Sequence, residues 1–450
     1  MSTPVDHDRR VFLRRGAMGL GALWTVSLGE LLARGKRGSF AGPSPYGPVE
    51  PVRDGTTGLP LLYLPSGFRY LSYSWTGDPL KDGSPCPGAH DGMAVIERRP
   101  NSSEIVLVRN HEQGNGAPFL KNADLIYSDG RSGGTTNLVF DTERGQWKEA
   151  WASLSGTSRN CAGGVTPWGT WITGEEVANE ISHGYCFEVG VEKGNPYPIV
   201  DMGRFSHEAV MVDPATGFVY ETEDAGATSG FYKFVPNVAR TLHKGGALFM
   251  LKVKGQANVD LSAGSPVGTR WDVEWVRIAD PKAAAQSTFE QGQLAGAAKF
   301  QRLEGAYWGD KTGYFVSTSG GAAKCGQIFE YNPGAETLKL VYESPARIHA
   351  DYPDNVTVTP RGGLLLCEDS GNTVSPGERL LGLTLDGNVF TFGMNNVVLT
   401  SARNTVQPRD YRASEFAGCC YSPDGRWLFV NTQSPGITFA ITGPWGTGPL

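Results

Sequence analysis

Acidic residues and one cysteine recur at matched positions along this 450-residue sequence. When similar segments of the sequence are aligned, these residues fall into two columns. The opening column is the first position of each segment, and the closing column is its last. The opening column contains Asp91, Cys161, Glu208, Glu304 and Asp354, and the closing column contains Glu112, Glu176, Asp224 and Asp369. A single carboxylate beside a turn is usually a solvated cap, but so many matched carboxylates predict a shared site. Carboxylate oxygens suit calcium, and a thiolate among them suggests a transition metal as well.

The cysteines and histidines divide into those that fall on or beside these columns and those that do not. Cys161 alone would more often be an inert buried thiol, but its counterparts are carboxylates, which favours a ligand role. His111 and His207 flank column residues, and either a structural or a ligand role fits them. Seven cysteines leave at least one unpaired, and their spacing indicates no disulfide framework. No chemistry is assigned to the cysteines that match no column, Cys186, Cys325 and Cys367.

The segments that contain the columns are predicted β-hairpins. Each copy has a polar anchor, a short strand rich in Val, Tyr, Phe or Trp, a Pro/Gly turn and a second strand. Six copies recur along the chain, at residues 91–112, 161–176, 208–224, 304–319, 354–369 and 418–431. This repetition in a Gly-rich chain predicts an all-β fold, a six-bladed β-propeller with irregular loop insertions. A pair of β-sandwiches is the competing architecture.

A propeller would turn the two columns into one site. The innermost strand of each blade lines a central channel, so equivalent positions of successive blades converge on one axis. Carboxylates and a thiolate in a narrow channel repel one another unless their pKa values rise or cations lie among them. The longest insertion lies between Glu223 and Glu304, and Trp445 with the C-terminal tail is expected to close the ring against the first blade.

Composition and charge exclude several other classes of protein. The chain has 60 Gly and 29 Pro, yet 40% of its residues are hydrophobic, which argues against disorder and collagen. Only 19% are charged, which argues against a helical bundle or coiled coil. The chain has 40 Lys and Arg against 46 Asp and Glu, and seven of the basic residues lie within the first 41 positions. The remaining body is strongly acidic, so a nucleic-acid partner is not expected.

The N-terminus has the pattern of an export signal. Residues 8–14 resemble the twin-arginine signature, and an apolar run follows at 16–29. As a helix this run would span roughly 21 Å, whereas a hydrocarbon core is about 30 Å thick, which favours a removed signal over a membrane span. We therefore expect a twin-arginine signal peptide over 1–41, recognised by that export machinery, and a single propeller domain over 42–450. The mature protein is expected in the periplasm or outside the cell, with no membrane span after signal removal.

The cysteine segment resembles a known family. Residues 160–171, followed by Gly174-Glu175-Glu176, are similar to the PhoX-type alkaline phosphatases. Supporting matches lie at 109–112, 203–208, 302–304, 353–355 and 422–436. The resemblance implies an exported phosphomonoesterase on a six-bladed propeller, with a mixed iron–calcium cluster and small phosphate esters as substrates.

The resemblance also implies roles for individual residues. Cys161 would be the iron-ligating thiolate, and Arg302 would hold the substrate phosphate through its planar fork of donors. The implied carboxylate ligands of iron and calcium are Glu176, Glu208, Asp224, Glu304 and Asp369. The sequence departs from the family pattern at Leu303, where Pro is common, and in the polar stretch 317–321, where more Asn is expected.

Two other functions also fit the columns. A calcium-dependent propeller lactonase gathers carboxylates in its channel as well, but it would need neither Cys161 nor Arg302. A non-catalytic propeller would use structural calcium and bind a partner on one face.

Overall fold

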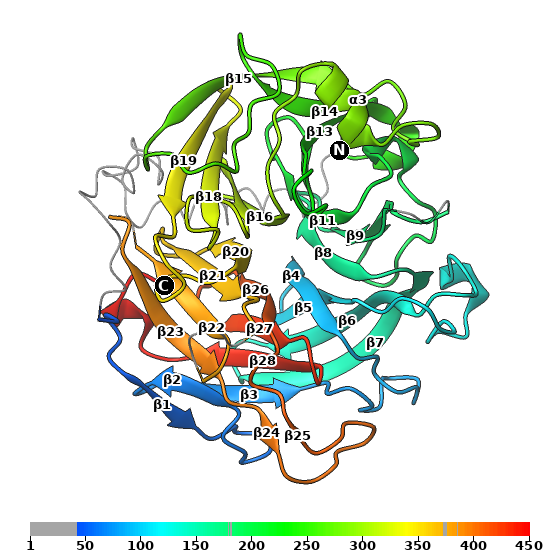
Figure 1. Ribbon diagram of the computed structural model, residues 1–450. Coiled ribbons are helices and arrows are strands. Elements are labelled where there is room, and N and C mark those ends of the chain that lie inside the picture. The colour runs from blue at the N-terminus through cyan, green and yellow to red at the C-terminus, as the bar shows by residue number, and fades with distance from the viewer. Residues whose placement is uncertain (1–42, 179, 181, 372–375, 385) are drawn as a thin grey trace.

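The computed structural model describes residues 43–450, except 179, 181, 372–375 and 385. The predicted signal peptide, residues 1–41, lies outside the described residues. Antiparallel sheets stand around a central axis in a propeller-like arrangement (Figure 1). One α-helix, α3 (Thr288–Leu294), occurs in the described part of the chain, together with 3₁₀ turns at Ala123–Leu125, Val200–Met202, Leu242–Lys244 and Trp445–Thr447. The predicted all-β class is therefore confirmed.

Most of the sheets are formed by strands that follow one another in the sequence. One sheet contains β4 (His90–Arg98), β5 (Glu104–His111), β6 (Gly133–Asp141) and β7 (Gln146–Thr157). The next contains β8 (Asn160–Val165), β9 (Trp171–Glu175) and β10 (Cys186–Val189). A nine-stranded sheet contains β11 (His207–Val212), β12 (Val219–Glu223), β13 (Phe231–Pro236), β14 (Gly246–Val253), β15 (Arg270–Arg277), β16 (Leu303–Trp308), β17 (Gly313–Ser317), β18 (Gln327–Asn332) and β19 (Thr337–Glu343).

The remaining sheets combine strands from both ends of the chain. A six-stranded sheet contains β1 (Val49–Val52), β2 (Leu62–Pro65), β20 (Pro353–Val358), β21 (Leu364–Glu368), β22 (Arg379–Leu383) and β23 (Val389–Asn395). A four-stranded sheet contains β3 (Arg69–Tyr73), β26 (Phe416–Tyr421), β27 (Leu428–Thr432) and β28 (Ile437–Thr442). A small ribbon is formed by β24 (Val398–Leu399) and β25 (Arg409–Asp410).

The ring is closed by an early strand rather than by the C-terminal tail. β3 pairs with β28, and Tyr70 lies opposite Ile441 in this pair. The expectation that Trp445 closes the ring is therefore corrected. Trp445 instead packs on Phe68 and Phe392, with ring centroids 4.8 and 5.3 Å apart. Backbone hydrogen bonds between strands from opposite ends of the chain leave no open seam there.

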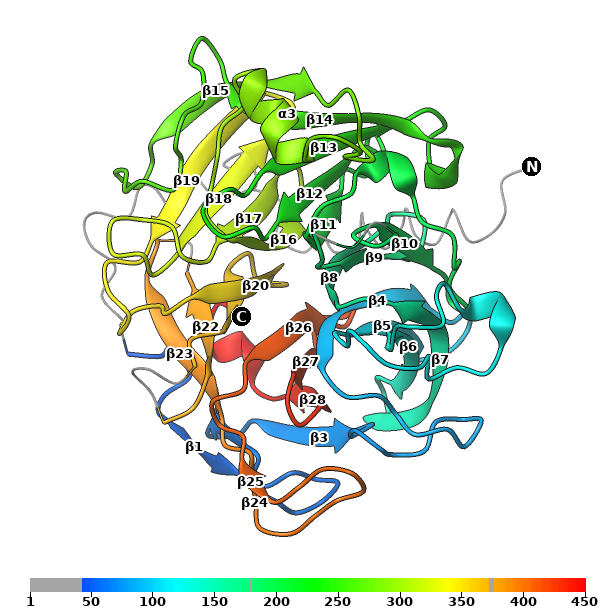
Figure 2. The same cartoon turned by 45° about the vertical axis from the view of Figure 1, so that its right-hand side comes forward.

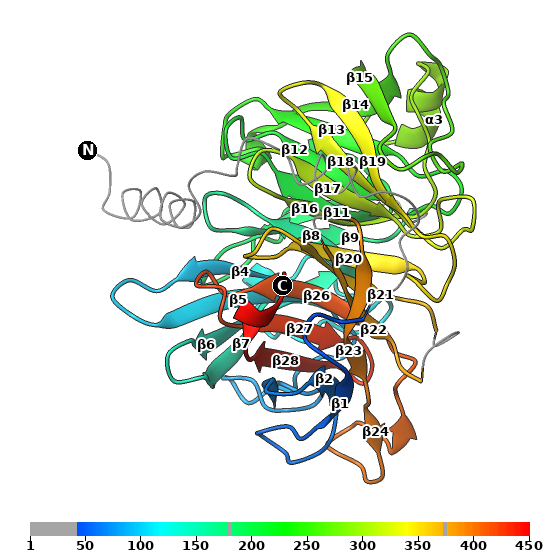
Figure 3. The same ribbon diagram turned by 90° about the vertical axis from the view of Figure 1, so that its left-hand side faces the viewer.

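The long insertion before Glu304 extends the sheets outward. β13 and β14 continue the sheet of β11 and β12, and β15 pairs with both β14 and β19. This bridging strand joins two neighbouring groups of strands into the nine-stranded sheet. The helix α3 starts at a capping box, in which Ser287 and Glu290 bond to each other's backbone amides. It lies with β14 and β15 at the rim of the molecule (Figure 3).

Six inner strands surround the axis and share one irregularity. β4, β8, β11, β16, β20 and β26 each contact the next, and β26 returns to β4 (Figure 2). In β11, His207 pairs with Glu223 and Val210 with Glu221, which leaves two residues opposite one in a β-bulge. The other five inner strands shift register at the corresponding place. A bulge re-aims a side chain, and each of these bulges lies at the opening-column position.

The inner strands approach one another so closely that several positions exclude a side chain. A Cβ added to Gly92 would lie 2.7 Å from the Cα of Ala162, and one at Gly305 would lie 2.6 Å from the carbonyl oxygen of Asp354. Farther out, aromatic side chains fill the space between the two groups of strands that β15 joins, as where Phe231 of β13 stacks on Phe315 of β17 with ring centroids 4.2 Å apart. The strands around the axis are therefore held backbone to backbone. No helix among the described residues is both long and apolar enough to cross a membrane.

Gly164 on β8 offers a direct test of this packing. A Cβ there would lie 1.8 Å from the carbonyl oxygen of Val210, a backbone atom that cannot rotate away. We expect Gly164→Ala to lower the free energy of unfolding by about 3 kcal/mol or more, measured by denaturant titration. Gly130→Ala is the matched control, because a Cβ at Gly130 meets nothing within 4 Å. Equal unfolding midpoints for the two variants would contradict the close approach of these strands.

Candidate metal centre and active site

The bulges bring the opening column to one end of the channel. Candidate ligand atoms lie within 4.8 Å of one another in four groups: Asp91–Glu112–Cys161, Cys161–Glu176–Glu208, Glu208–Glu304–Asp354 and Asp354–Asp369–Glu415. Each group shares a residue with the next, so the nine residues form one continuous set, which we call the channel cluster. Its inner members are almost fully buried, because no more than 6% of Asp91, Glu208, Glu304 or Asp354 is exposed.

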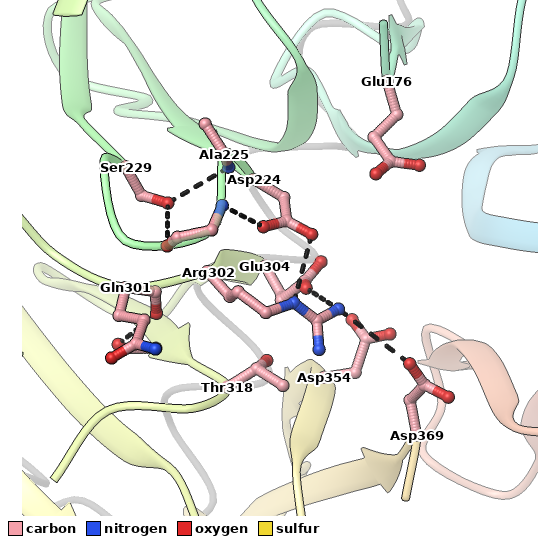
Figure 4. A network of polar contacts seen from close by, with 12 residues as sticks. Glu176, Asp224, Ala225, Ser229, Gln301, Arg302, Glu304, Thr318, Asp354 and Asp369 are labelled. Carbon is pink, nitrogen blue, oxygen red and sulfur yellow. Dashed lines mark hydrogen bonds and ion pairs between the residues drawn. The ribbon is translucent and has the colours of Figure 1, made fainter. Parts of the chain in front are cut away.

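The closing column lies at the mouth above these residues. Glu176 directly follows β9, Asp224 follows β12 and Asp369 follows β21, so each stands at the end of the second strand of its hairpin. Asp224 belongs to none of the four groups, but its Oδ2 lies 3.3 Å from Nε of Arg302. The six residues predicted as metal ligands and the predicted phosphate-binding Arg302 therefore all lie at the same end of the channel. Figure 4 shows Arg302 among Asp224, Glu304, Asp354 and Asp369.

Two hairpins lack a carboxylate where the columns would place one. In the fourth hairpin the closing position is Thr318, whose hydroxyl donates to the Pro353 carbonyl at 2.6 Å and so holds backbone rather than pointing at the cluster. In the last hairpin the opening position is Gly418, whose amide donates to Asn355 Oδ1 at 2.7 Å. The cluster is therefore not a regular six-fold ring, and its two gaps lie on different hairpins.

Three residues of the site were not found from the sequence: Arg159, Glu415 and Gln433. Gln433 directly follows β27, as the closing column requires, and its Nε2 donates to Glu112 Oε2 at 2.6 Å. The last predicted hairpin ends at residue 431, two residues before Gln433, so the closing column did not include it. Glu415 immediately precedes β26 and has no counterpart in the other hairpins, so no column could have found it. Asp91, Glu112 and Asp354 belonged to the columns but not to the ligand set that the family resemblance implied.

Two arginines occupy equivalent places over the cluster. Arg159 and Arg302 each lie two residues before an opening-column residue, with left-handed φ angles of 49° and 45°. Nη2 of Arg302 lies 2.6 Å from Glu304 Oε1, and Nη2 of Arg159 lies 2.5 Å from both Glu112 Oε1 and Glu176 Oε2. Their side chains are 32% and 47% exposed, so a solute at the mouth can reach them. Because Arg159 and Arg302 stand at the same distance from their column residues, the position of Arg302 could have indicated Arg159 from the sequence.

Burial and crowding make the negative charge of the cluster costly. Burial, and next the charge of Glu176, raise the pKa of Glu112 to about 8. Burial and the charge of Asp369 raise the pKa of Asp354 to about 7, and burial with the charge of Asp354 raises the pKa of Glu208 well above its usual range. Burial would lower the pKa of Arg302, but the charges of Glu304 and Asp224 raise it above its ordinary value. Two guanidinium groups against eight carboxylates and a thiol leave most of this charge uncompensated.

Glu208 shows most directly that the cluster suits cations. Both of its carboxylate oxygens are buried, and neither finds a hydrogen-bond partner among the described residues. A buried polar atom without a partner destabilises the fold unless an ion or water satisfies it. Carboxylate oxygens beside the Cys161 thiol provide both hard and soft donors, so the residues present fit a mixed metal centre.

The two histidines left open by the sequence point away from the cluster. The ring nitrogens of His111 lie 2.9 Å from the Gly88 carbonyl and 2.9 Å from the Thr136 hydroxyl, which gives it a structural role. Nδ1 of His207 lies 3.3 Å from Glu221, on the side of β11 opposite to Glu208. Neither imidazole belongs to the channel cluster.

Beyond the anchors the channel is largely apolar. A cavity of about 480 Å³ is lined there by small and hydrophobic residues of the inner strands, among them Met93, Val165, Met211, Trp308 and Val356. The charged residues that line the channel are therefore concentrated at its acidic end. An ester substrate with a charged group would have to be recognised at that mouth, where the arginines lie.

Comparison with known proteins identifies the family of this chain. The family model described as "Alkaline phosphatase PhoX" matches residues 44–151 and 144–436, which together span most of the chain. The chain belongs to the PhoX family. It is accordingly an alkaline phosphatase of a metal-dependent family, as the resemblance of residues 160–171 predicted. A search of curated protein sequences finds no match.

One solved structure shows a similar fold. The structure of Pseudomonas fluorescens PhoX in complex with vanadate, a transition state analogue, aligns with a TM-score of 0.64 and 16% sequence identity. The alignment covers 89% of this chain and 99% of that one. A gluconolactonase from Xanthomonas campestris aligns at a TM-score of 0.41 and 14% identity, over 91% of this chain and 99% of the other. The likeness to the PhoX structure supports a propeller-like architecture.

Proposed function

We propose that this PhoX-family phosphatase hydrolyses phosphate monoesters at an iron–calcium centre held by the channel cluster of a six-bladed propeller, with one blade for each inner strand. The observation that supports the centre most strongly is the buried, unpartnered carboxylate of Glu208 within a set of nine candidate ligands. Anions at such a density remain ionised at neutral pH only when cations lie among them. No other described group of candidate ligands combines this number of carboxylates with a thiol.

The donor atoms divide the centre into a softer and a harder part. Cys161 groups with Glu176 and Glu208, and a thiolate beside carboxylates suits iron. Glu304, Asp354, Asp369 and Glu415 form the all-oxygen part, which suits calcium, and Asp224 extends it at the mouth. When bound, these cations would neutralise phosphate oxygens and stabilise the charge that develops as the P–O bond breaks.

Arg302 is proposed to bind the substrate phosphate, and Arg159 offers a second guanidinium on the other side of the mouth. Both now pair with cluster carboxylates, within 2.6 Å for Arg302–Glu304 and 2.5 Å for Arg159–Glu176. Once cations balance those carboxylates, the planar donor forks can turn to phosphate oxygens, which they bind in a bidentate manner. The lactonase alternative gives no role to the Cys161 thiol or to either arginine.

Export completes the proposal. Residues 1–41, with their twin arginines, are proposed to be a removed signal read by the twin-arginine machinery, leaving residues 42–450 as one exported domain in the periplasm or the medium. That route transports folded proteins, which suits a cluster whose buried ligands must be loaded as the chain folds.

Elemental analysis and hydrolysis assays on the native exported protein test the function together. We expect iron and calcium in the purified protein and turnover of p-nitrophenyl phosphate, with no turnover of a γ-lactone. Lactone hydrolysis without phosphatase activity would favour the lactonase instead, and a metal-replete protein inactive on both would favour a binding role.

Cys161→Ser tests the iron assignment. We expect the native protein to show a thiolate-to-iron charge-transfer absorption, and the variant to lose that absorption with nearly all of its iron, because the softest donor is removed. Cys325→Ser is the matched control, since Cys325 is a buried thiol outside the channel cluster. Active native protein that is colourless and free of iron would refute the role of Cys161.

A further inference from the structure

A second group of candidate ligands lies outside the channel, between two neighbouring sheets. It comprises Cys186, the first residue of β10, His207, the first residue of β11, and Glu221 on β12. All three are completely buried, at 0% exposure. His207 directly precedes Glu208, whose carboxylate enters the channel, so the two side chains leave β11 on opposite faces. We call these three residues the interblade triad.

The three donor atoms already have the spacing of a metal site. Sγ of Cys186 lies 3.3 Å from Nδ1 of His207 and 3.9 Å from Oε2 of Glu221, and the last two atoms are 3.3 Å apart. Zinc bonds of about 2.3 Å to sulfur and about 2.0–2.1 Å to nitrogen and oxygen, at tetrahedral angles, place such donors roughly 3.3–3.6 Å apart. One cation therefore fits between these atoms with little movement of the side chains.

The orientation of the imidazole also matches that of a ligand. Nε2 of His207 lies 3.1 Å from the carbonyl oxygen of Gly203, which can only accept, so Nε2 holds the proton of the neutral ring. The lone pair of Nδ1 then faces Cys186 and Glu221. The Phe205 ring, 3.7 Å away between centroids, holds the imidazole in place. A backbone carbonyl that fixes the tautomer of a histidine is a usual accompaniment of metal ligation.

The remaining oxygen of the triad has no partner. Oε1 of Glu221 is buried, and no described residue forms a hydrogen bond with it. Such an orphaned acceptor in a dry interior is destabilising. A cation bound by the thiolate, the imidazole and the carboxylate would neutralise this group and bring positive charge beside its unpartnered oxygen.

We propose that the interblade triad binds one zinc-type divalent cation, which ties β10 to β11 and β12 and is separate from the channel centre. Thiolate, imidazole and carboxylate donors together suit zinc, and they do not form a calcium site. Because all three donor residues are completely buried, the site is structural rather than catalytic. The proposal does not depend on the proposed function of the channel.

The decisive measurement is zinc-edge X-ray absorption on the full native protein. The protein is expressed in medium that contains zinc and is then dialysed against metal-free buffer. We expect about one zinc per chain, with one sulfur and one imidazole nitrogen in its first shell. The imidazole signature is diagnostic, because the triad is the described candidate group that contains a histidine. Absence of zinc, or zinc with sulfur and oxygen but no imidazole, would overturn the proposal, the latter by placing the ion in the channel.

Variants provide a second readout that does not use activity. In a Cys161→Ser background, cobalt added during expression should give a thiolate-to-cobalt absorption that vanishes when Cys186→Ser is added. Cys325→Ser in the same background should leave it unchanged. An absorption that survives Cys186→Ser would refute the assignment. A failure of the channel proposal would instead appear as missing iron and missing phosphatase activity, with the zinc signal intact.

Discussion

Arg302→Ala should lower kcat for phosphomonoester hydrolysis by about 10²- to 10³-fold while the iron and calcium content stays that of the native protein. This is the usual loss when one preorganised donor to a developing oxyanion is removed. Arg302 lies at the centre of the acidic mouth, 2.6 Å from Glu304 and 3.3 Å from Asp224, with a third of its side chain open to solvent. The change is measured by steady-state kinetics with p-nitrophenyl phosphate and by elemental analysis of the same preparation.

The metal content separates two roles that Arg302 could have. As a counterion alone, it would hold Glu304 and Asp224 in place, and its loss would release metals and activity together. As a phosphate-binding group, it would leave metals bound and lose turnover. Arg302→Lys refines the distinction, because lysine keeps the charge but lacks the planar fork, so we expect it to recover only part of the rate. Arg98→Ala, at an exposed position at the end of β4, is the matched control. Unchanged kinetics in Arg302→Ala would remove Arg302 from the active site.

The column residues lie close together in the structure because a propeller-like arrangement brings equivalent positions of successive strands to one axis. Asp91, Cys161, Glu208 and Glu304 lie at the same step of four inner strands, so their side chains meet whatever the length of the loops between them. The spacing could not show why they point inward. That depends on a β-bulge at each anchor, and the type of residue at the anchor does not predict this backbone feature.

The columns did not include the site residues that lie where the hairpins differ from one another. Gln433 lies two residues beyond the last predicted hairpin, 418–431, and Glu415 lies before its anchor Gly418, at a position with no counterpart in the other hairpins. The closing strand β3 follows β1 and β2 in the chain, but it pairs with β28 at the other end of the chain. Cys186 was assigned no chemistry because its partners His207 and Glu221 come from the neighbouring sheet, and only the packing of the two sheets brings them together.

The second large effect concerns the protein stripped of its metals. The metal-free protein should become less stable as the pH rises from about 5 to about 8, by roughly 5 kcal/mol in the free energy of unfolding. Burial and the charge of Glu176 raise the pKa of Glu112 from an ordinary 4.5 to about 8 in the folded state, and Asp354 rises from 3.8 to about 7. Each pH unit between the two pKa values of a group corresponds to about 1.4 kcal/mol.

The direction follows from proton binding in the two states. Between pH 4.5 and pH 8 the unfolded chain has released the Glu112 proton while the folded chain still holds it, so the folded state binds more protons. Stability therefore falls with rising pH in this window and levels off above the folded pKa. Bound cations favour the ionised carboxylates of the folded state. The metal-loaded protein should therefore be more stable than the stripped one, and most of all at pH 8.

Guanidinium titrations of stripped and loaded protein at pH 5 and pH 8 measure the effect. Glu112→Gln is the informative variant, because its neutral amide cannot titrate, and the stripped variant should exceed stripped wild type in stability at pH 8 and lose less between the two pH values. Glu97→Gln, on β4, the strand that pairs with the β5 strand before Glu112, lies outside the cluster and should behave as wild type. If the stripped protein were equally stable at both pH values, like charges would not be crowded at the axis. The need for cations in the channel would then disappear, and with it the physical basis for the metal centre.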